Sequence, residues 1–195
     1  MTTTATEPTA TELTTVAPSR WSLDRDGSSV GFTVKTIWGL IPVRGRFERY
    51  AGSYEVGPNG TTIELTIDAA SIDTGTPDRD THLRSADFFD VEKYPTLTFK
   101  STRVERIDDE RLRVAGDLTI RDVTREIVLD VTYGGRRKDP WGNERAGFEA
   151  RASLDRKDYG LTWNQALELG GVLVGDRIEL DLAIEAVKAA DAKAA

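Results

Sequence analysis

The 195-residue sequence contains no cysteine and only one histidine, His82. Without cysteine the chain can form no disulfide, bind no metal through thiolates and perform no thiol catalysis. A single histidine also excludes a zinc or copper centre that takes several histidines from one chain. We therefore expect no metal site.

Long apolar runs and an excess of positive charge are also absent. No run approaches the ~18 apolar residues of a membrane-spanning helix. The start of the chain, rich in Thr, Pro and Glu, lacks the basic residues and the apolar stretch of a secretory signal. These features predict a cytoplasmic protein without stable membrane insertion. The formal net charge of −7 disfavours nucleic acid and anionic membranes as partners, since both require a basic face.

The residues that are present indicate a globular, all-β protein. Hydrophobic residues make up 38% and charged residues 30% of the chain, a balance that is typical of one soluble domain. The clearest strand pattern runs from Arg177 to Ala186, where Ile178, Leu180, Leu182 and Ile184 alternate with polar residues. Similar alternation recurs along the chain between turn signals such as Asp26-Gly27 and Gly134-Gly135.

This pattern predicts eight or nine strands in an antiparallel sandwich or barrel, and it favours an elongated eight-stranded barrel, because closing the sheet removes its exposed edges. We expect the barrel to span residues 20–187, with disordered tails at 1–19 and 188–195. Two segments interrupt the alternation. Residues 78–89 are predicted to form a short helical crossing between strands, and residues 155–175 a glycine-rich irregular insert.

One motif suggests a hydrolase, but its sequence context does not support this hypothesis. Gly27 to Gly31 matches G-x-S-x-G, and Ser29, Asp68 and His82 follow each other in the order used by α/β-hydrolases. That motif needs a strand before the serine and a helix after it, whereas here a turn is predicted before Ser29 and a strand after it. A cryptic esterase is therefore the third hypothesis.

The acidic residues around His82 favour structural roles. Asp78, Asp80 and Asp87 are interleaved with arginines and do not match a calcium-binding loop, so ion pairing and helix capping explain them. His82 is expected to hydrogen-bond and orient this segment or to contact a ligand. The run from Gly170 to Gly175 lacks the Lys-Ser/Thr of a phosphate-binding loop, and we expect no cofactor.

The barrel interior is the remaining candidate site. A barrel of about eight strands is either filled by its own side chains or holds one small ligand. The predicted inward residues are aromatic, aliphatic or small, and none of them is charged. From these residues alone, a filled core and a ligand-binding pore both stay open.

Three separated motifs resemble the YceI-like family of lipocalin-like, polyisoprenoid-binding proteins. They are HLRSADFFDVEKYPTLTFKS (82–101), RDVTREIVLDV (121–131) and WNQALELGGVLVGDRIELDLAIEA (163–186). The resemblance extends from Trp21 to Val187. It implies an elongated barrel whose hydrophobic pore carries a long isoprenoid or fatty chain, without an established catalytic function.

The resulting hypothesis is a non-catalytic carrier that holds an isoprenoid or other long-chain lipid. The pore-lining candidates are Phe32, Val34, Phe47, Phe88, Phe89, Phe99, Leu118, Trp163 and Leu173. The candidates for contacting a polar headgroup are His82, Arg84 and Arg44. The alternative is a filled barrel that acts as a stress-related or protein-interaction module, and a homodimer is one of the oligomeric states left open.

Overall fold

The computed structural model describes residues 18–37, 39–58, 60–167 and 173–189, and strands dominate these residues. The strands are β1 (Ser19–Thr36), β2 (Ile41–Phe47), β3 (Tyr50–Gly57), β4 (Gly60–Asp68), β5 (Ile72–Asp73), β6 (Thr96–Arg106), β7 (Arg111–Ile120), β8 (Val123–Lys138), β9 (Glu144–Asp155) and β10 (Val174–Lys188). The helical elements are α1 (Pro77–Arg84) and two 3-10 turns, η1 (Ala69–Ser71) and η2 (Arg156–Tyr159). No helix among the described residues is long and apolar enough to cross a membrane.

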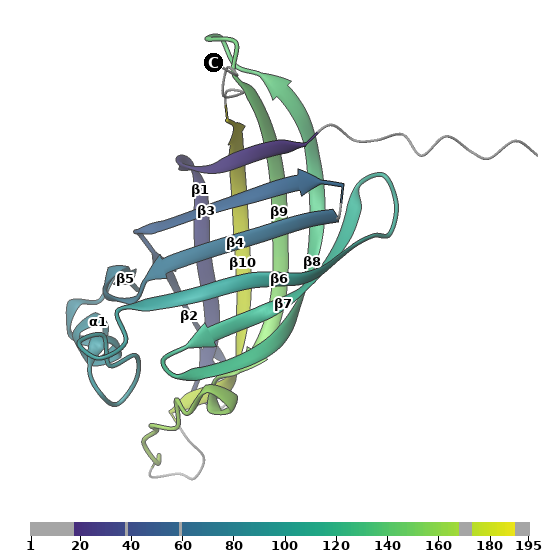
Figure 1. The fold of residues 1–195 in the computed structure, drawn as a ribbon. Coiled ribbons are helices and arrows are strands. Elements are labelled where there is room, and N and C mark those ends of the chain that lie inside the picture. Colours follow the sequence, from purple (N-terminus) through teal and green to yellow (C-terminus); the bar gives the residue numbers. More distant parts are fainter. Residues whose placement is uncertain (1–17, 38, 59, 168–172, 190–195) are drawn as a thin grey trace, which may run out of the picture.

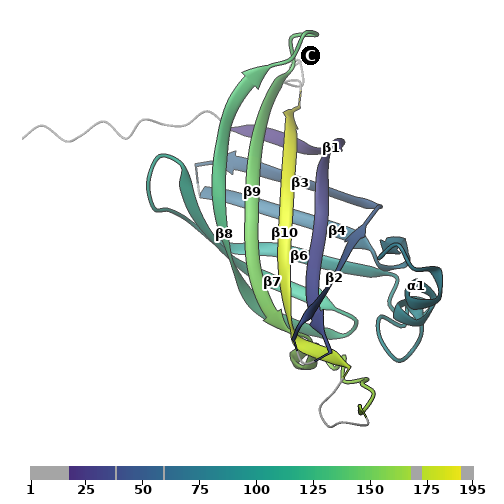
Figure 2. The same cartoon turned by 180° about the vertical axis from the view of Figure 1, so that it is seen from behind.

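The strands close into a barrel because β10 pairs with both β9 and β1. The first part of β1 pairs with β3 and its last part with β2, so β2 and β3 act as one interrupted strand. In the same way β4 and β5 are separated only by η1. The ten strand segments therefore form an antiparallel barrel of eight strands, as predicted (Figures 1 and 2).

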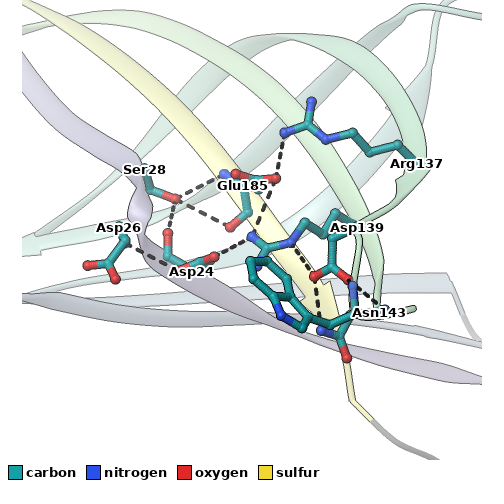
Figure 3. A network of polar contacts seen from close by, with 9 residues as sticks. Asp24, Asp26, Ser28, Arg137, Asp139, Asn143 and Glu185 are labelled. Carbon is teal, nitrogen blue, oxygen red and sulfur yellow. Dashed lines mark hydrogen bonds and ion pairs between the residues drawn. The ribbon is translucent and has the colours of Figure 1, made fainter.

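Two predicted turns are wrong, because both lie inside long strands. At Asp26-Gly27 the register of β1 against β10 shifts between Asp24 and Ser29. The Ser28 hydroxyl donates to the carbonyl of Asp24 and accepts from the amide of Glu185, which holds the bulge (Figure 3). Gly134-Gly135 forms a second bulge, in β8, where Gly135 has a φ of 91°. Small residues suit turns and bulges equally, so composition alone did not distinguish the two.

The predicted helical crossing is present, although α1 itself is shorter than predicted and ends at Arg84. The buried Asp80 carboxylate accepts hydrogen bonds from the amide and the hydroxyl of Thr74. The Arg84 guanidinium donates to the carbonyl oxygens of Ala70 and Ile72. These contacts fix α1 against η1 and β5.

The end of the barrel opposite α1 is closed by aromatic side chains. Trp21 is fully buried and stacks on Tyr54, which meets Phe148 edge-on with ring centroids 5.5 Å apart. Beside this cluster, Arg145 contacts the carboxylates of Asp24, Asp139 and Glu185. Figure 3 labels these three acidic residues.

Candidate functional site: an apolar cavity in the barrel

A cavity of about 160 Å³ lies inside the barrel and is lined almost entirely by apolar side chains. Its lining extends along β10 from Val174 to Leu182. At ~3.3 Å per residue these eight steps correspond to about 26 Å, so the cavity is long and narrow.

Strand alternation directs the apolar residues of β10 into this cavity. Ile178, Leu180 and Leu182 line it, whereas Glu179 and Asp181 between them are exposed. This confirms the period-two pattern read from the sequence, because successive side chains of a strand point to opposite faces.

Two phenylalanine rings lie flat against glycines of the neighbouring strand. A Cβ built on Gly45 would stand 2.3 Å from the Phe32 ring, and one on Gly116 would stand 2.4 Å from the Phe99 ring. Carbon atoms need about 3.5 to 4.0 Å. The two glycines therefore allow the rings to fold against the wall, which leaves space along the centre of the barrel.

Further aromatic residues cover the cavity at the α1 end. The Phe47 ring contacts both Phe32 and Phe89, each at a centroid distance of 5.9 Å. Phe88 packs on Trp163 of the segment after η2, at 5.4 Å. Side chains from the crossing and from this later segment thus meet over one end of the cavity.

His82 belongs to this cover and has structural partners. Its Nε2 lies 2.9 Å from Oδ2 of Asp87, and its ring meets Trp163 edge-on at 4.5 Å. Asp68 instead binds Arg49 and the amide of Ala70, and Ser29 lies within β1 with no helix after it. The three residues of the hydrolase hypothesis therefore make separate contacts.

The predicted absence of charge from the barrel interior is wrong, because Arg156 lies there. It lines the cavity with a relative exposure of only 3%. Its guanidinium donates hydrogen bonds to the carbonyl oxygens of Leu161, Trp163 and Gly175, and it also pairs with Asp176. A buried charge persists when its donors are satisfied in this way.

Tyr159, at the end of η2 and three residues after Arg156, packs into the main core. Its residue exposure is 2%, and among the described residues its hydroxyl has no hydrogen-bond partner. Burial, reinforced by the charge of Asp158, raises the pKa of Tyr159 to about 12. The neutral phenol is therefore strongly favoured in the folded state.

The structure brings together most of the predicted pore residues. Those that line the cavity are Phe32, Val34, Phe47, Phe88, Phe89, Phe99 and Leu118. Trp163 lies outside that lining and packs on His82 and Phe88. Leu173 lies next to Val174, which does line the cavity.

The predicted headgroup candidates are separated. Arg84 is engaged with backbone carbonyls, as described above, and Arg44 is exposed on the strand pair of β1 and β2 opposite Thr33. Only His82 lies in the cover of the cavity, with its side chain 36% exposed. Among the described residues, no group of three or more acidic or histidine side chains is arranged to hold a metal ion.

Sequence reasoning gave no inward position to several residues that line the cavity, and Ile72, Leu161 and Arg156 are among them. All three lie in or beside the 3-10 turns, where alternation stops. Periodicity therefore carried no signal for them.

Comparison with known proteins agrees with this architecture. The YceI-like domain family matches residues 21–186. The chain belongs to this family. Protein YceI of Salmonella arizonae is 34% identical over 175 residues, which cover 87% of each chain.

Solved structures of the YceI-like family share the barrel. The YCEI protein of Campylobacter jejuni is 34% identical, with a TM-score of 0.67 over 76% of this chain and 86% of its own. A polyisoprenoid-binding domain from Saccharophagus degradans is 18% identical, with a TM-score of 0.64 over 87% of this chain and 98% of its own. At that identity the second similarity concerns the fold alone.

Proposed function

We propose that this YceI-like protein is a non-catalytic carrier that holds a long-chain isoprenoid, or a similar amphiphilic lipid, in its barrel cavity. The observation that carries the proposal is the cavity itself, which is long, narrow and apolar. Arg156, the only charged lining residue in the described part of the chain, already donates to backbone carbonyls. The polyisoprenoid-binding domain from Saccharophagus degradans, which has the same fold, supports the choice of ligand class.

Burial of hydrocarbon supplies the driving force. Each buried CH₂ group contributes about 0.8 kcal/mol, so ten such groups contribute about 8 kcal/mol before the cost of ordering the chain. The polar end of the lipid would then need few contacts. His82 is the remaining candidate for such a contact, because Arg84 and Arg44 are directed elsewhere.

The volume of the cavity sets a condition on binding. Sites for drug-sized ligands usually measure about 300 to 1,000 Å³, whereas this cavity measures about 160 Å³. A long chain therefore enters only if cover residues move, and the half-buried Phe89 and Leu83 are the side chains best placed to do so. Storage or transport of the lipid would follow from such reversible loading.

The same small volume favours a second candidate function. If the cover does not open, the barrel is a filled scaffold that acts through its surface, as a stress-related or protein-interaction module. The two functions differ in whether a hydrocarbon chain enters the barrel.

Binding of a polyprenyl alcohol to delipidated protein distinguishes the two functions. We expect Leu180→Trp to abolish binding, because the indole would occupy the cavity. Asp181→Trp is the matched control, since its side chain starts from the exposed face of the same strand. Circular dichroism establishes that both variants are folded. Absence of binding by the wild-type protein, or equal binding by both variants, would contradict the carrier function.

A further inference from the structure

The apolar cavity stops part-way along the barrel. On β10 its lining ends at Leu182, although the strand continues to Lys188. On β8 the lining ends at Leu129, and the next inward residue, Val131, is buried. Both strands run along the barrel beside β9 (Figure 2). Because inward residues of a strand are two positions apart, side chains fill the barrel from Val131 and Ile184 onward.

Phe148 of β9 forms the floor at which the cavity stops. It lies opposite Ile184, where the filled part of β10 begins. Its ring meets Tyr54 edge-on at a centroid distance of 5.5 Å and lies 5.4 Å from Tyr133. Phe148 packs both against the main core, which contributes to the cavity lining, and against the separate cluster around Trp21. It therefore separates the cavity from that cluster.

Behind this floor the barrel is sealed by Trp21. Its indole is fully buried and stacks on Tyr54, with the ring planes 9° apart. Ala146 and Ala186 in the same cluster are also buried, and the Arg136 guanidinium lies 5.0 Å from the centre of the indole. A hydrocarbon chain in the cavity therefore meets a closed wall at this end, and we place its entrance at the α1 end.

The distance from entrance to floor limits the length of a bound chain. The lining of β10, from Val174 to Leu182, corresponds to about 26 Å along the strand. Strands of a barrel tilt by about 35 to 45° from its axis, which leaves about 20 Å along the axis. Carbon–carbon bonds of about 1.5 Å advance an extended chain by about 1.3 Å per carbon. The cavity therefore matches about 16 chain carbons, which is about four isoprene units.

We propose that Phe148 determines the length of the lipid tail that this protein binds. The cavity takes about four isoprene units, tail first, and further units stay outside the barrel. Because burial of hydrocarbon drives binding, only the units that reach the interior add to the affinity. The inference rests on the proposed carrier function and specifies the ligand of that same site.

Competition binding with polyprenyl alcohols of increasing length tests this limit. The delipidated full-length protein is loaded with a fluorescent farnesol analogue, which alcohols of two to seven isoprene units then displace. For the wild-type protein we expect the affinity to rise about tenfold or more with each unit up to about four. Each further unit should change the affinity by less than about twofold, because it remains in solvent.

Two variants move the floor in opposite directions. Phe148→Ala deepens the cavity, so the affinity should keep rising for about one or two further units. Ala150→Leu adds side-chain volume opposite Leu182 and should lower the limit by about one unit. The matched controls are Trp141→Ala, which removes an aromatic side chain that is 81% exposed, and Glu149→Leu, which places a leucine at an exposed position of β9. Both controls should keep the wild-type limit.

The length limit and the carrier function fail in distinguishable ways. Affinity that rises as steeply beyond four units as below them, or an unchanged limit in both floor variants, would overturn the proposal and leave the carrier function intact. Circular dichroism shows whether the variants fold; if Phe148→Ala does not, an unchanged limit in Ala150→Leu overturns the proposal by itself. A wild-type protein that binds none of the alcohols contradicts the carrier function, and the length limit with it.

Discussion

Replacing Arg156 by methionine tests how the α1 end of the barrel is held together. Methionine keeps an unbranched side chain of the length of the arginine stem, but it lacks the guanidinium group and provides no donor. The carbonyls of Leu161, Trp163 and Gly175 would lose their buried partner, and the segment between η2 and β10 would lose its attachment to the barrel. Asp176 would retain Lys157.

The expected loss of unfolding free energy is large. Removing one partner from a buried charged network costs about 3 to 5 kcal/mol, because the remaining polar groups stay desolvated. A domain of ordinary stability has only about 5 to 15 kcal/mol in total. Arg156→Lys should give an intermediate loss, since an ammonium has three donors and lacks the planar fork of the guanidinium.

Urea unfolding followed by circular dichroism measures this loss. The matched control is Arg177→Met, which makes the same chemical change at an exposed position of β10; we expect it to change the free energy by less than about 0.5 kcal/mol. Equal losses in Arg156→Met and Arg177→Met would refute the reasoning, because burial and donor geometry would then be irrelevant.

Three further predictions concern the cavity wall and two titrating groups. Gly45→Ala should lower polyprenyl binding, because its Cβ would displace the Phe32 ring 2.3 Å away, whereas Gly147→Ala, which meets nothing within 4 Å, should not; titration calorimetry compares them. Burial would raise the pKa of Asp139, but hydrogen bonds from Asn143, Arg145 and the amides of Asn143 and Trp141 lower it to about 2. This carboxylate thus stabilises the fold above its ordinary pKa of 3.8, and urea titrations should show that stability declining as the pH falls through about 2, with a shallower decline in Asp139→Asn. Because the pKa of Tyr159 is raised from 10 to about 12, the stability that its neutral phenol contributes is present below pH 10 and lost as the pH rises towards 12, and Tyr159→Phe should reduce that loss. Since the hydroxyl has no hydrogen-bond partner among the described residues, Tyr159→Phe should not destabilise the fold at neutral pH.

The sequence predicted the barrel wall because the wall obeys a local rule. Leu180 and Asp181 differ in direction only through strand alternation, and that period is visible in the chain. The same rule located the apolar set that includes Phe32 and Phe99. The positions of their rings were not predictable, since these depend on which glycine, Gly45 or Gly116, lies beside them on the neighbouring strand.

The irregular segments escaped prediction for a related reason. The role of Arg156 depends on carbonyls that converge from positions 5, 7 and 19 residues further along the chain, and no periodic pattern signals such a convergence. The prediction of a turn at Asp26-Gly27 was wrong because the bulge depends on a partner on another strand. The Glu185 amide on β10 donates to the Ser28 hydroxyl and holds the bulge. Arg44 was considered a headgroup contact from its charge alone, and pairing with Thr33 places it on the outer face.

Lipid recovered with the native protein tests the central claim most directly. The protein is purified from its native host without detergent and extracted with organic solvent, and the extract is analysed by mass spectrometry. The carrier account predicts one isoprenoid or similar long-chain lipid per protein molecule, and its loss from the Leu180→Trp variant but not from Asp181→Trp. Repeated recovery of no stoichiometric lipid, together with no binding of added polyprenyl alcohol, would contradict it.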